Sequence, residues 1–228
     1  MNRPGEPFRL EIVSDTICPW CFVAKRRLDA ALLMLGDDMA FSITWRPFEL
    51  NPDMPREGRD RKTYRSEKFG SWERSLELDE QVKSAAAEDG LVFHHDRMAV
   101  TPNTLASHVL IALAGEIGRQ TPVVEAVFRA YFQDGRDIGD PDVLEEIGTA
   151  CGIGGEGLAA ALSDEALRAE VKTEAQAFAR GGIRGVPSVL VNRFVVFSGA
   201  LRTDLMAEKL RSAMRDKRVA SPPGAAHG

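Results

Sequence analysis

Two cysteines, Cys18 and Cys21, lie where a strand-like segment meets a helix-like one, and this junction constrains the fold more than any other feature. Residues 8–13 alternate between apolar and polar side chains, as a strand does, whereas residues 22–35 carry apolar side chains at helical spacing. Cysteines three positions apart on the first turn of a helix share one face and can form a disulfide. The helix N-terminus favours a thiolate there. The junction therefore predicts a redox-active dithiol.

The rest of the chain predicts an α/β fold that is interrupted by helices. A second strand at residues 41–46 makes the chain begin β-α-β, which implies a parallel pair with a right-handed crossover. After residue 51 helical periodicity dominates, and strands return only at 188–191 and 195–197, before a last helix at 203–214. Four helix starts are predicted from capping residues, three of them followed by proline: Thr101-Pro102, Thr121-Pro122, Asp140-Pro141 and Ser163.

Composition narrows the function classes. A net charge of −5 over 228 residues argues against nucleic acid and against an anionic membrane surface as partners. No apolar run approaches the roughly 20 residues that a membrane-spanning helix needs, and the first residues lack the apolar segment of a signal peptide. Three cysteines are too few for a secreted disulfide framework. We therefore expect a cytoplasmic protein that binds neither nucleic acid nor membranes.

Four motifs occur in a characteristic order. They are Ser14-Asp15-Thr16-Ile17-Cys18-Pro19-Trp20-Cys21-Phe22, Trp45-Arg46-Pro47-Phe48-Glu49-Leu50-Asn51-Pro52, Thr101-Pro102-Asn103-Thr104 and Gly185-Val186-Pro187-Ser188. With them the chain resembles the cytoplasmic FrnE-type branch of the DsbA family. The resemblance implies a thioredoxin-like fold with a large all-helical insertion. We expect a discontinuous thioredoxin-like domain at residues 1–55 and 170–216, the insertion at 56–169 and a disordered tail at 217–228.

The resemblance also implies roles for single residues. Cys18 would be the exposed nucleophile that forms mixed disulfides, and Cys21 the more buried thiol that resolves them. Pro187 would be a cis-proline facing the pair, and Val186 would offer its backbone to an extended substrate. The other residues expected to contact substrate are Pro19, an exposed Trp20, Asn103 and Thr104. Protein disulfides or small thiols would be the partners, without a bound cofactor but with glutathione as an optional redox co-substrate. An apolar face of the insertion would support a homodimer.

Three alternatives compete with this interpretation. Cys18 and Cys21 can form half of a zinc site, but the remaining ligands would have to come from Cys151 and scattered histidines, so we predict no metal. Glutathione-dependent enzymes of the 2-hydroxychromene-2-carboxylate isomerase and kappa transferase classes share the implied architecture. They generally carry one nucleophile rather than a complete CxxC, and Gly199-Ala200 stand where they have Ser-Asp. The third alternative is a peptide-binding chaperone or a redox sensor.

Other conspicuous side chains have simpler interpretations. Cys151 is expected to be a small buried hydrophobic residue, and His94-His95 are expected to be surface or capping residues. His108 either lines the site or is a hydrogen-bonded helix histidine without a further role. The basic run Lys25-Arg26-Arg27 is expected to face solvent.

Overall fold

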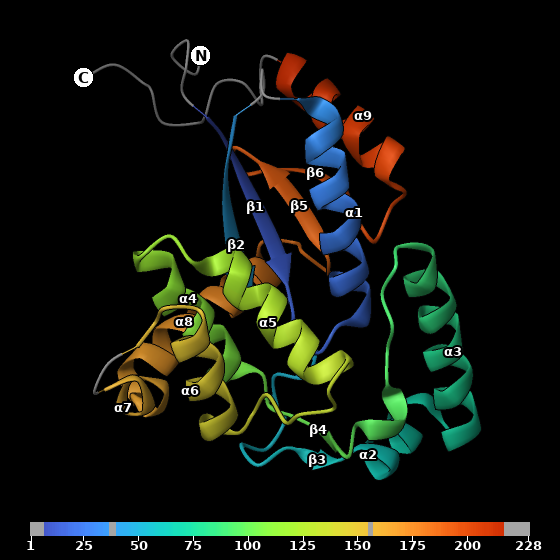
Figure 1. Cartoon of the computed structure of the whole chain (residues 1–228), viewed down its shortest axis with the longest axis vertical. Coiled ribbons are helices and arrows are strands. Elements are labelled where there is room, and N and C mark those ends of the chain that lie inside the picture. Colours follow the sequence, from blue (N-terminus) through green and yellow to red (C-terminus); the bar gives the residue numbers. More distant parts are fainter. Residues whose placement is uncertain (1–6, 37–39, 155–156, 217–228) are drawn as a thin grey trace.

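The computed structural model describes residues 7–36, 40–154 and 157–216, and it is built around a four-stranded sheet (Figure 1). The strands lie in the order β2-β1-β5-β6. β1 and β2 are parallel, whereas β5 is antiparallel to both β1 and β6. Their bounds are β1 Phe8–Ser14, β2 Phe41–Pro47, β5 Ser188–Val191 and β6 Phe194–Ser198. The sheet thus combines the N-terminal and C-terminal parts of the chain, as predicted.

Helices cover both faces of this sheet. Because side chains of a strand alternate between faces, Leu10 packs in the same cluster as α1 (Pro19–Leu35), whereas Val13 packs with Phe178 of α8 (Glu165–Arg180). A last helix, α9 (Thr203–Arg215), lies beside α1 (Figure 1). The short segment between β1 and α1 leaves the first turn of α1 at the end of the central strand, and both cysteines lie there.

The remaining helices lie between β2 and α8 in sequence and form the insertion. They are α2 Arg61–Phe69, α3 Trp72–Glu88, the short 3-10 helix η1 His95–Arg97, α4 Leu105–Glu116, α5 Gln120–Phe132, α6 Pro141–Ala150 and α7 Leu158–Ser163. A small antiparallel pair, β3 (Arg59–Asp60) and β4 (Val100–Thr101), lies among them. The architecture confirms the α/β, thioredoxin-like fold with a helical insertion. The expected domain boundary at residue 170 falls inside the continuous helix α8, and residues 217–228 lie outside the described residues.

An aromatic cluster joins α1 to the insertion. Phe22 of α1 is fully buried and stacks on Phe93, Phe128 and Phe132, with ring centroids 5.7, 5.1 and 6.1 Å away. Burying one such ring stabilises the fold by about 1.5–3 kcal/mol. Because Phe22 follows Cys21 directly, this cluster also holds the first turn of α1 against the insertion.

One predicted helix start is confirmed, and another is wrong by several residues. Asp140 caps α6, accepting a hydrogen bond from the Asp142 N–H at 2.9 Å. Thr101, by contrast, pairs with Arg59 in the β3–β4 ladder. Helix α4 therefore begins only at Leu105, whose N–H donates a hydrogen bond to Asn103 Oδ1 at 3.0 Å. A strand partner distant in sequence has overridden a local capping pattern.

The two other predicted starts are displaced by one or two residues. Helix α5 begins at Gln120, and the Thr121 hydroxyl accepts a hydrogen bond from Trp45 Nε1 at 3.1 Å instead of capping the helix. Ser163 is the last residue of α7, and Asp164 caps α8 in its place. Aspartate and serine are equally good caps, so the sequence could not distinguish these neighbours.

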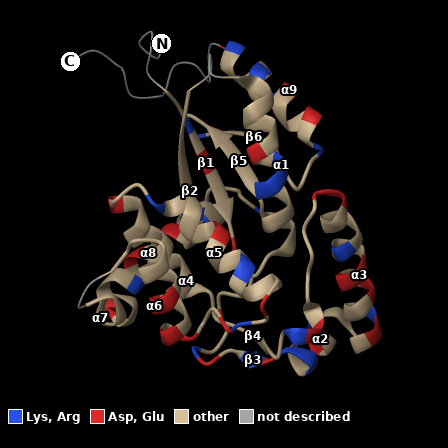
Figure 2. Ribbon diagram, viewed as in Figure 1, with Lys and Arg blue, Asp and Glu red and all other residues tan. Residues whose placement is uncertain are grey.

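The basic run Lys25-Arg26-Arg27 does not face solvent as expected, because the insertion covers most of it. The side chains of Lys25 and Arg27 are only 5% and 10% exposed. Lys25 Nζ lies 2.8 Å from Glu125 Oε2 of α5, and Arg27 Nε lies 2.6 Å from Asp89 Oδ2, just after α3. These ion pairs attach α1 to two different helices of the insertion; Figure 2 shows the distribution of charged residues.

A second group of charges is buried between α2 and α3. The two carboxylate oxygens of Asp79 lie 2.6 Å from Arg61 Nη2 and 2.8 Å from Arg65 Nη2. His95 Nε2 lies 4.0 Å from Asp79, and the His95 side chain is only 10% exposed, so this histidine is not the surface residue that was expected. Its neighbour His94 is half-buried. Burial lowers the pKa of His95 to about 4, and the two arginines act in the same direction against the attraction of Asp79.

The protein is therefore expected to lose stability as the pH falls below neutral. Unfolded His95 titrates near its ordinary pKa of 6.5, whereas folded His95 resists protonation until about pH 4. The unfolded state thus binds the proton first, and the free energy of unfolding should fall by about 2 kcal/mol between about pH 7 and about pH 5. Urea unfolding of His95→Gln should show a smaller fall than the natural chain, whereas His94→Gln is the matched control. An equal pH dependence in His95→Gln would contradict this prediction.

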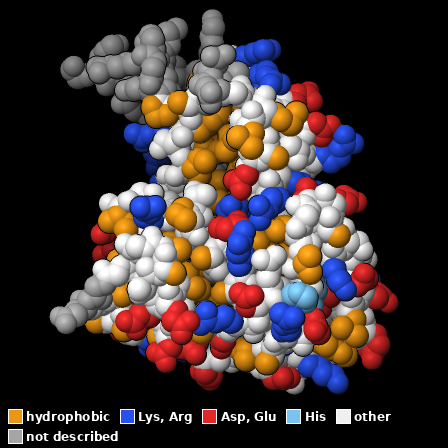
Figure 3. Space-filling model, viewed as in Figure 1, with side chains coloured by type: hydrophobic (Ala, Val, Ile, Leu, Met, Phe, Trp, Pro, Cys, Tyr) orange, Lys and Arg blue, Asp and Glu red, His pale blue; other side chains and the backbone are white. Residues whose placement is uncertain are grey.

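Hydrophobic side chains gather on the surface between α1 and β2, in the upper half of Figure 3. Leu32, Leu33, Phe41 and Ile43 line a shallow depression there, and Leu33 is 83% exposed. This surface is formed by α1 and β2 and not by the insertion, where an apolar face for a homodimer was expected; the homodimer stays a prediction. None of the described helices is long and apolar enough to cross a membrane.

Candidate active site

Cys18 occupies the N-cap position of α1. Its N–H donates to the Asp15 carbonyl at 3.0 Å, and Pro19 follows at the first helical position, where a missing N–H is tolerated. The Cys18 thiol donates a weak hydrogen bond to the Val186 carbonyl, with Sγ and O 3.7 Å apart. Cys18 is only 4% exposed, so it is not the open nucleophile that was expected, because the Val186 loop lies against it. Trp20, at 37% exposure, is the exposed residue between the cysteines.

Cys21 is the more deeply buried of the two thiols, with 1% exposure. Its N–H donates to the Cys18 carbonyl at 3.0 Å, so both residues belong to one helical turn. Burial raises the pKa of the Cys21 thiol well above its ordinary value, and the neighbouring Cys18 adds to this effect. Hydrogen bonds with the Ser14 side chain and the Asp15 backbone act in the opposite direction. Burial thus makes Cys21 a weaker acid than an exposed thiol.

A loop from the far end of the chain faces Cys18. The Val186–Pro187 peptide bond is cis, as the resemblance implies. The Ser188 hydroxyl donates to the Gly185 carbonyl at 2.9 Å and lies 2.7 Å from the Ser198 hydroxyl, which holds this loop onto β6. A groove of about 480 Å³ runs beside the loop, lined by residues 182–188 and by Val195, Ser198 and Gly199. Val186, whose carbonyl accepts the hydrogen bond from Cys18, is one of the residues that line this groove.

A buried polar group lies behind the cysteines. The Asp15 carboxylate is fully buried; it accepts a hydrogen bond from the Leu50 N–H at 2.7 Å and lies 3.5 Å from His108 Nε2. His108 Nε2 also lies 3.0 Å from the Phe48 carbonyl, so this nitrogen carries the proton. Burial raises the pKa of the adjacent Glu49. His108 is thus both hydrogen-bonded within the core and close to the site, which were the two alternatives that its sequence left open.

Asn103 connects the insertion to the loop that follows β2, and Thr104 connects it to the segment that precedes the dithiol. Asn103 Nδ2 donates to the Met54 carbonyl at 2.7 Å. The Thr104 carbonyl accepts a hydrogen bond from the Ser107 hydroxyl at 2.8 Å, and that hydroxyl lies 2.7 Å from Thr16 Oγ1. The first turn of α4 therefore contacts the chain two residues before Cys18. A direct contact of Asn103 or Thr104 with substrate stays a prediction.

Lys68 of α2 is a charged residue near the site that sequence reasoning missed. Its Nζ donates to Asn51 Oδ1, which also accepts a hydrogen bond from the Tyr64 hydroxyl at 2.6 Å. Burial lowers the pKa of Lys68, and attraction to Asp15 and Cys18 opposes that shift. The one sequence signal for this part of the site was Asn51, which belongs to one of the four motifs. Lys68 itself lies on helix α2 of the insertion, and no local sequence pattern predicts that this helix packs beside Asn51.

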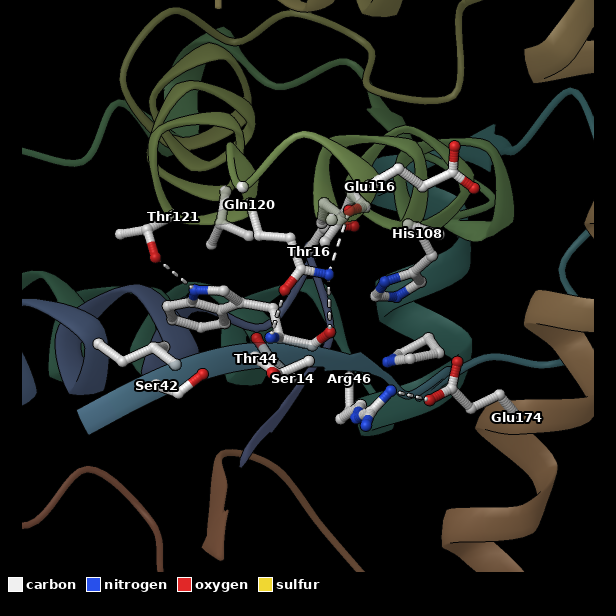
Figure 4. Close-up of a pocket in the computed structure, with 18 of the residues that line it drawn as sticks. Ser14, Thr16, Ser42, Thr44, Arg46, His108, Glu116, Gln120, Thr121 and Glu174 are labelled. Carbon is white, nitrogen blue, oxygen red and sulfur yellow. Dashed lines mark hydrogen bonds and ion pairs between the residues drawn. The ribbon is translucent and has the colours of Figure 1, made fainter. Parts of the chain in front are cut away.

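Sequence reasoning also missed a cavity of about 570 Å³ between β2 and the helices α4 and α5 (Figure 4). Gln120 crosses its wall and pairs with the open edge of β2, accepting from the Trp45 N–H at 2.9 Å and donating to the Trp45 carbonyl at 3.3 Å. Ser14, Thr16 and His108, which lie close to the dithiol, line the same cavity. The cavity wall thus includes residues that stand four and two positions before Cys18 in the chain, although neither cysteine lines it.

Fold and site together define a class of protein: a thioredoxin-like fold with two free thiols on the first turn of its first helix, facing a cis-proline loop. Within the described residues, no group of three or more potential ligands is arranged to hold a metal ion. A family model described as the DSBA-like thioredoxin domain matches residues 9–211. The chain belongs to this family.

The solved structures that share this fold include the following three. The probable DsbA oxidoreductase SCO1869 from Streptomyces coelicolor is 30% identical, with a TM-score of 0.83 over 92% of this chain and 91% of that one. The cytosolic disulfide reductase DsbM from Pseudomonas aeruginosa with GSH is 22% identical, with a TM-score of 0.63 over 91% and 99% of the two chains. A 2-hydroxychromene-2-carboxylate isomerase is 16% identical, with a TM-score of 0.67 over 90% and 94%. Because the fold serves different activities, the residues of the site must decide the function.

Proposed function

We propose that the protein is a thiol–disulfide oxidoreductase in which Cys18 and Cys21 alternate between a dithiol and a disulfide. The observation that carries this proposal is the pair itself: both thiols lie on the first turn of α1, with Cys18 Sγ 3.7 Å from the carbonyl of Val186 in the cis-proline loop. Dithiol exchange needs two thiols within bonding reach and a helix N-terminus that favours the thiolate. Membership of the DSBA-like family and the likeness to SCO1869 support the same function.

The exchange would proceed through a mixed disulfide. The Cys18 thiolate attacks one sulfur of a substrate disulfide and releases the other sulfur as a thiolate. Cys21 then attacks Cys18 Sγ, the bond between Cys18 and substrate breaks, and the reduced substrate leaves. The same steps run in reverse when the Cys18–Cys21 disulfide oxidises a dithiol substrate. The exposed Trp20 and the backbone of Val186 border Cys18 and would contact the substrate.

Substrates of two sizes suit the site. The groove beside Pro187 has room for an extended protein segment, whose backbone would pair with Val186. Lys68 of α2, which is exposed and interacts electrostatically with Cys18, would offer a positive charge to a small thiol that carries a carboxylate. Glutathione is such a thiol. The cytosolic disulfide reductase DsbM, which shares the fold, has been solved with GSH. We therefore infer a cytoplasmic enzyme that needs no bound cofactor and uses glutathione as a redox co-substrate.

The glutathione-dependent isomerase is the second candidate, because such an isomerase shares the fold. Two features of this chain count against it. The CxxC pair is complete, and Gly199-Ala200 occupy the place of the Ser-Asp pair that glutathione-dependent relatives use. A chaperone or sensor is ranked third, since binding alone does not require two thiols on one helical turn.

A redox titration tests the proposal. The protein is equilibrated in buffers with graded ratios of reduced to oxidised glutathione, its thiols are trapped by alkylation, and the Cys18–Cys21 state is read by mass spectrometry. We expect a reversible two-electron transition of Cys18 and Cys21, whereas Cys151, a half-buried lone thiol, can form only a mixed disulfide with glutathione, which adds the mass of glutathione. If no Cys18–Cys21 disulfide forms at any ratio, the proposal fails and the isomerase becomes the leading candidate.

A further inference from the structure

One arginine lies at the groove beside the cis-proline loop. Among the described residues that line this groove, Arg184 is the only charged one; the others are glycine, serine and apolar residues, including Val186 and Val195. Arg184 is exposed, and within the described part of the chain its guanidinium has no ion-pair or hydrogen-bond partner. The buried Arg27 and Arg61, by contrast, are each held 2.6 Å from a carboxylate oxygen. Arg184 thus brings an unpaired positive charge to the groove.

The loop that carries Arg184 is held on both sides. Before Arg184, the Ile183 N–H donates to the Phe178 carbonyl at 3.1 Å, and the Ile183 side chain is buried in the core. After Arg184, the Pro187 carbonyl accepts a hydrogen bond from the Gly199 N–H at 2.8 Å. The backbone of Arg184 is therefore fixed beside the groove before any substrate arrives, which lowers the entropy cost of binding.

The same loop brings Arg184 close to the dithiol. Val186 stands two residues after Arg184, and its carbonyl oxygen lies 3.7 Å from Cys18 Sγ. Two residues of a chain span at most about 7 Å, which is also about the length of two residues in an extended substrate. When the cysteine of a substrate is bonded to Cys18 and its backbone meets Val186, side chains about two positions from that cysteine therefore come within reach of the Arg184 guanidinium.

We propose that Arg184 selects protein substrates that carry an acidic side chain about two residues from the reactive cysteine. This inference rests on the proposed oxidoreductase function and names its substrate class. The chain as a whole has a net charge of −5, so its overall field does not attract acidic segments. The preference comes from a local ion pair, which the apolar Val186 and Val195 in the wall of the groove strengthen by displacing water.

The selection can be measured with short peptides, capped at both ends, whose single cysteine forms a disulfide with thionitrobenzoate. The Cys18 thiolate attacks the cysteine sulfur of the peptide, the bond between the peptide and thionitrobenzoate breaks, and the coloured thiolate leaves. The Cys21 thiolate then attacks Cys18 Sγ, the Cys18–Cys21 disulfide forms, and the peptide leaves as a thiolate that takes up a proton from solvent. The peptides differ at one position, two residues before or two residues after the cysteine, where they carry Glu, Gln or Lys.

The rate constant for release of the coloured thiolate should be about two- to fivefold higher with a Glu peptide than with its Gln counterpart, as expected for one exposed ion pair. Arg184→Gln should remove this difference, and Arg184→Glu should reverse it, so that a Lys peptide becomes the fastest. Comparing the same peptides between proteins cancels the intrinsic reactivity of each peptide. The preference of the natural protein should also disappear at about 1 M salt, where the screening length is about 3 Å.

Arg193→Gln is the matched control. It removes the same charge from the turn between β5 and β6, and Arg193 is exposed but does not line the groove, so the preference for Glu should persist. An equal ratio of Glu to Gln rates in the natural protein and in both Arg184 variants overturns the selection. If the natural protein reduces none of the peptides, the oxidoreductase function itself is wrong.

Discussion

A Cys18→Ser variant is expected to exchange disulfides at least about 1,000-fold more slowly than the natural chain, because a hydroxyl is a far poorer nucleophile and leaving group than a thiolate. That factor corresponds to about 4 kcal/mol of transition-state stabilisation. Fold stability should change little, since serine is close to cysteine in size and the Cys18 thiol makes only a weak hydrogen bond at 3.7 Å. The effect is measured as the rate at which glutathione reduces a model disulfide in the presence of the natural protein or of the Cys18→Ser variant.

The partner variant, Cys21→Ser, should fail at a different step. Cys18 can still attack, but no thiol remains on the same helical turn to resolve the product. A mixed disulfide between Cys18 and the substrate should therefore accumulate and be visible by mass spectrometry of the intact protein. Cys151→Ser, which alters a half-buried thiol at the C-cap of α6, is the matched control and should behave as the natural chain. Full activity of Cys18→Ser would refute the proposed nucleophile.

Asp79→Ala is expected to lower the free energy of unfolding by about 3–5 kcal/mol, because it leaves two buried guanidinium groups without their counter-charge. Arg61 is held 2.6 Å from one carboxylate oxygen and Arg65 2.8 Å from the other. Their side chains are only 5% and 19% exposed, so water cannot replace the lost carboxylate well. Urea unfolding of both proteins at neutral pH measures the difference.

The matched control lies on the same helix. Glu77 of α3 pairs with Arg74 at 2.7 Å, but both side chains are more than half exposed. Exposed pairs contribute about 0–1 kcal/mol, so Glu77→Ala should unfold almost as the natural chain does. A loss in Asp79→Ala no larger than that in Glu77→Ala would show that the buried cluster does not stabilise the fold.

Much of the fold was predictable because the signals that specify it are local. The alternation of residues 8–13 and the helical spacing of residues 22–35 depend on neighbours a few positions away, and both elements formed where expected. The Asp140 cap was predictable for the same reason. The capping pattern at Thr101 predicted a helix start that is wrong. The backbone of Thr101 pairs instead with Arg59, which lies more than forty residues earlier in the chain.

Site residues divide in the same way. The pairing of Cys18 with Cys21 follows from their spacing alone, and the assignment of Val186 and Pro187 came from a motif rather than from any local periodicity. Ser14 and Asp15 belong to one of the four sequence motifs, whereas Lys68 stands outside them. The spacing of these three residues did not predict a role for any of them. Their surroundings come from segments distant in sequence, since His108 of α4 lies 3.5 Å from Asp15, and Asp15 and Cys18 attract the charge of Lys68 on α2.

The amino-acid sequence alone was sufficient to predict the Cys18–Cys21 pair, the order of the main strands and helices, and the thioredoxin-like fold. Each of these predictions depends on residue types at short, fixed spacings. Burial was decided only by tertiary structure. Lys25 and His95 look like surface residues in the sequence, yet α5 covers the first and α2 and α3 enclose the second. Cys18 itself is covered by a loop from the other end of the chain. The energy of a charge or thiol depends on how much water its surroundings exclude, and segments distant in sequence supply those surroundings.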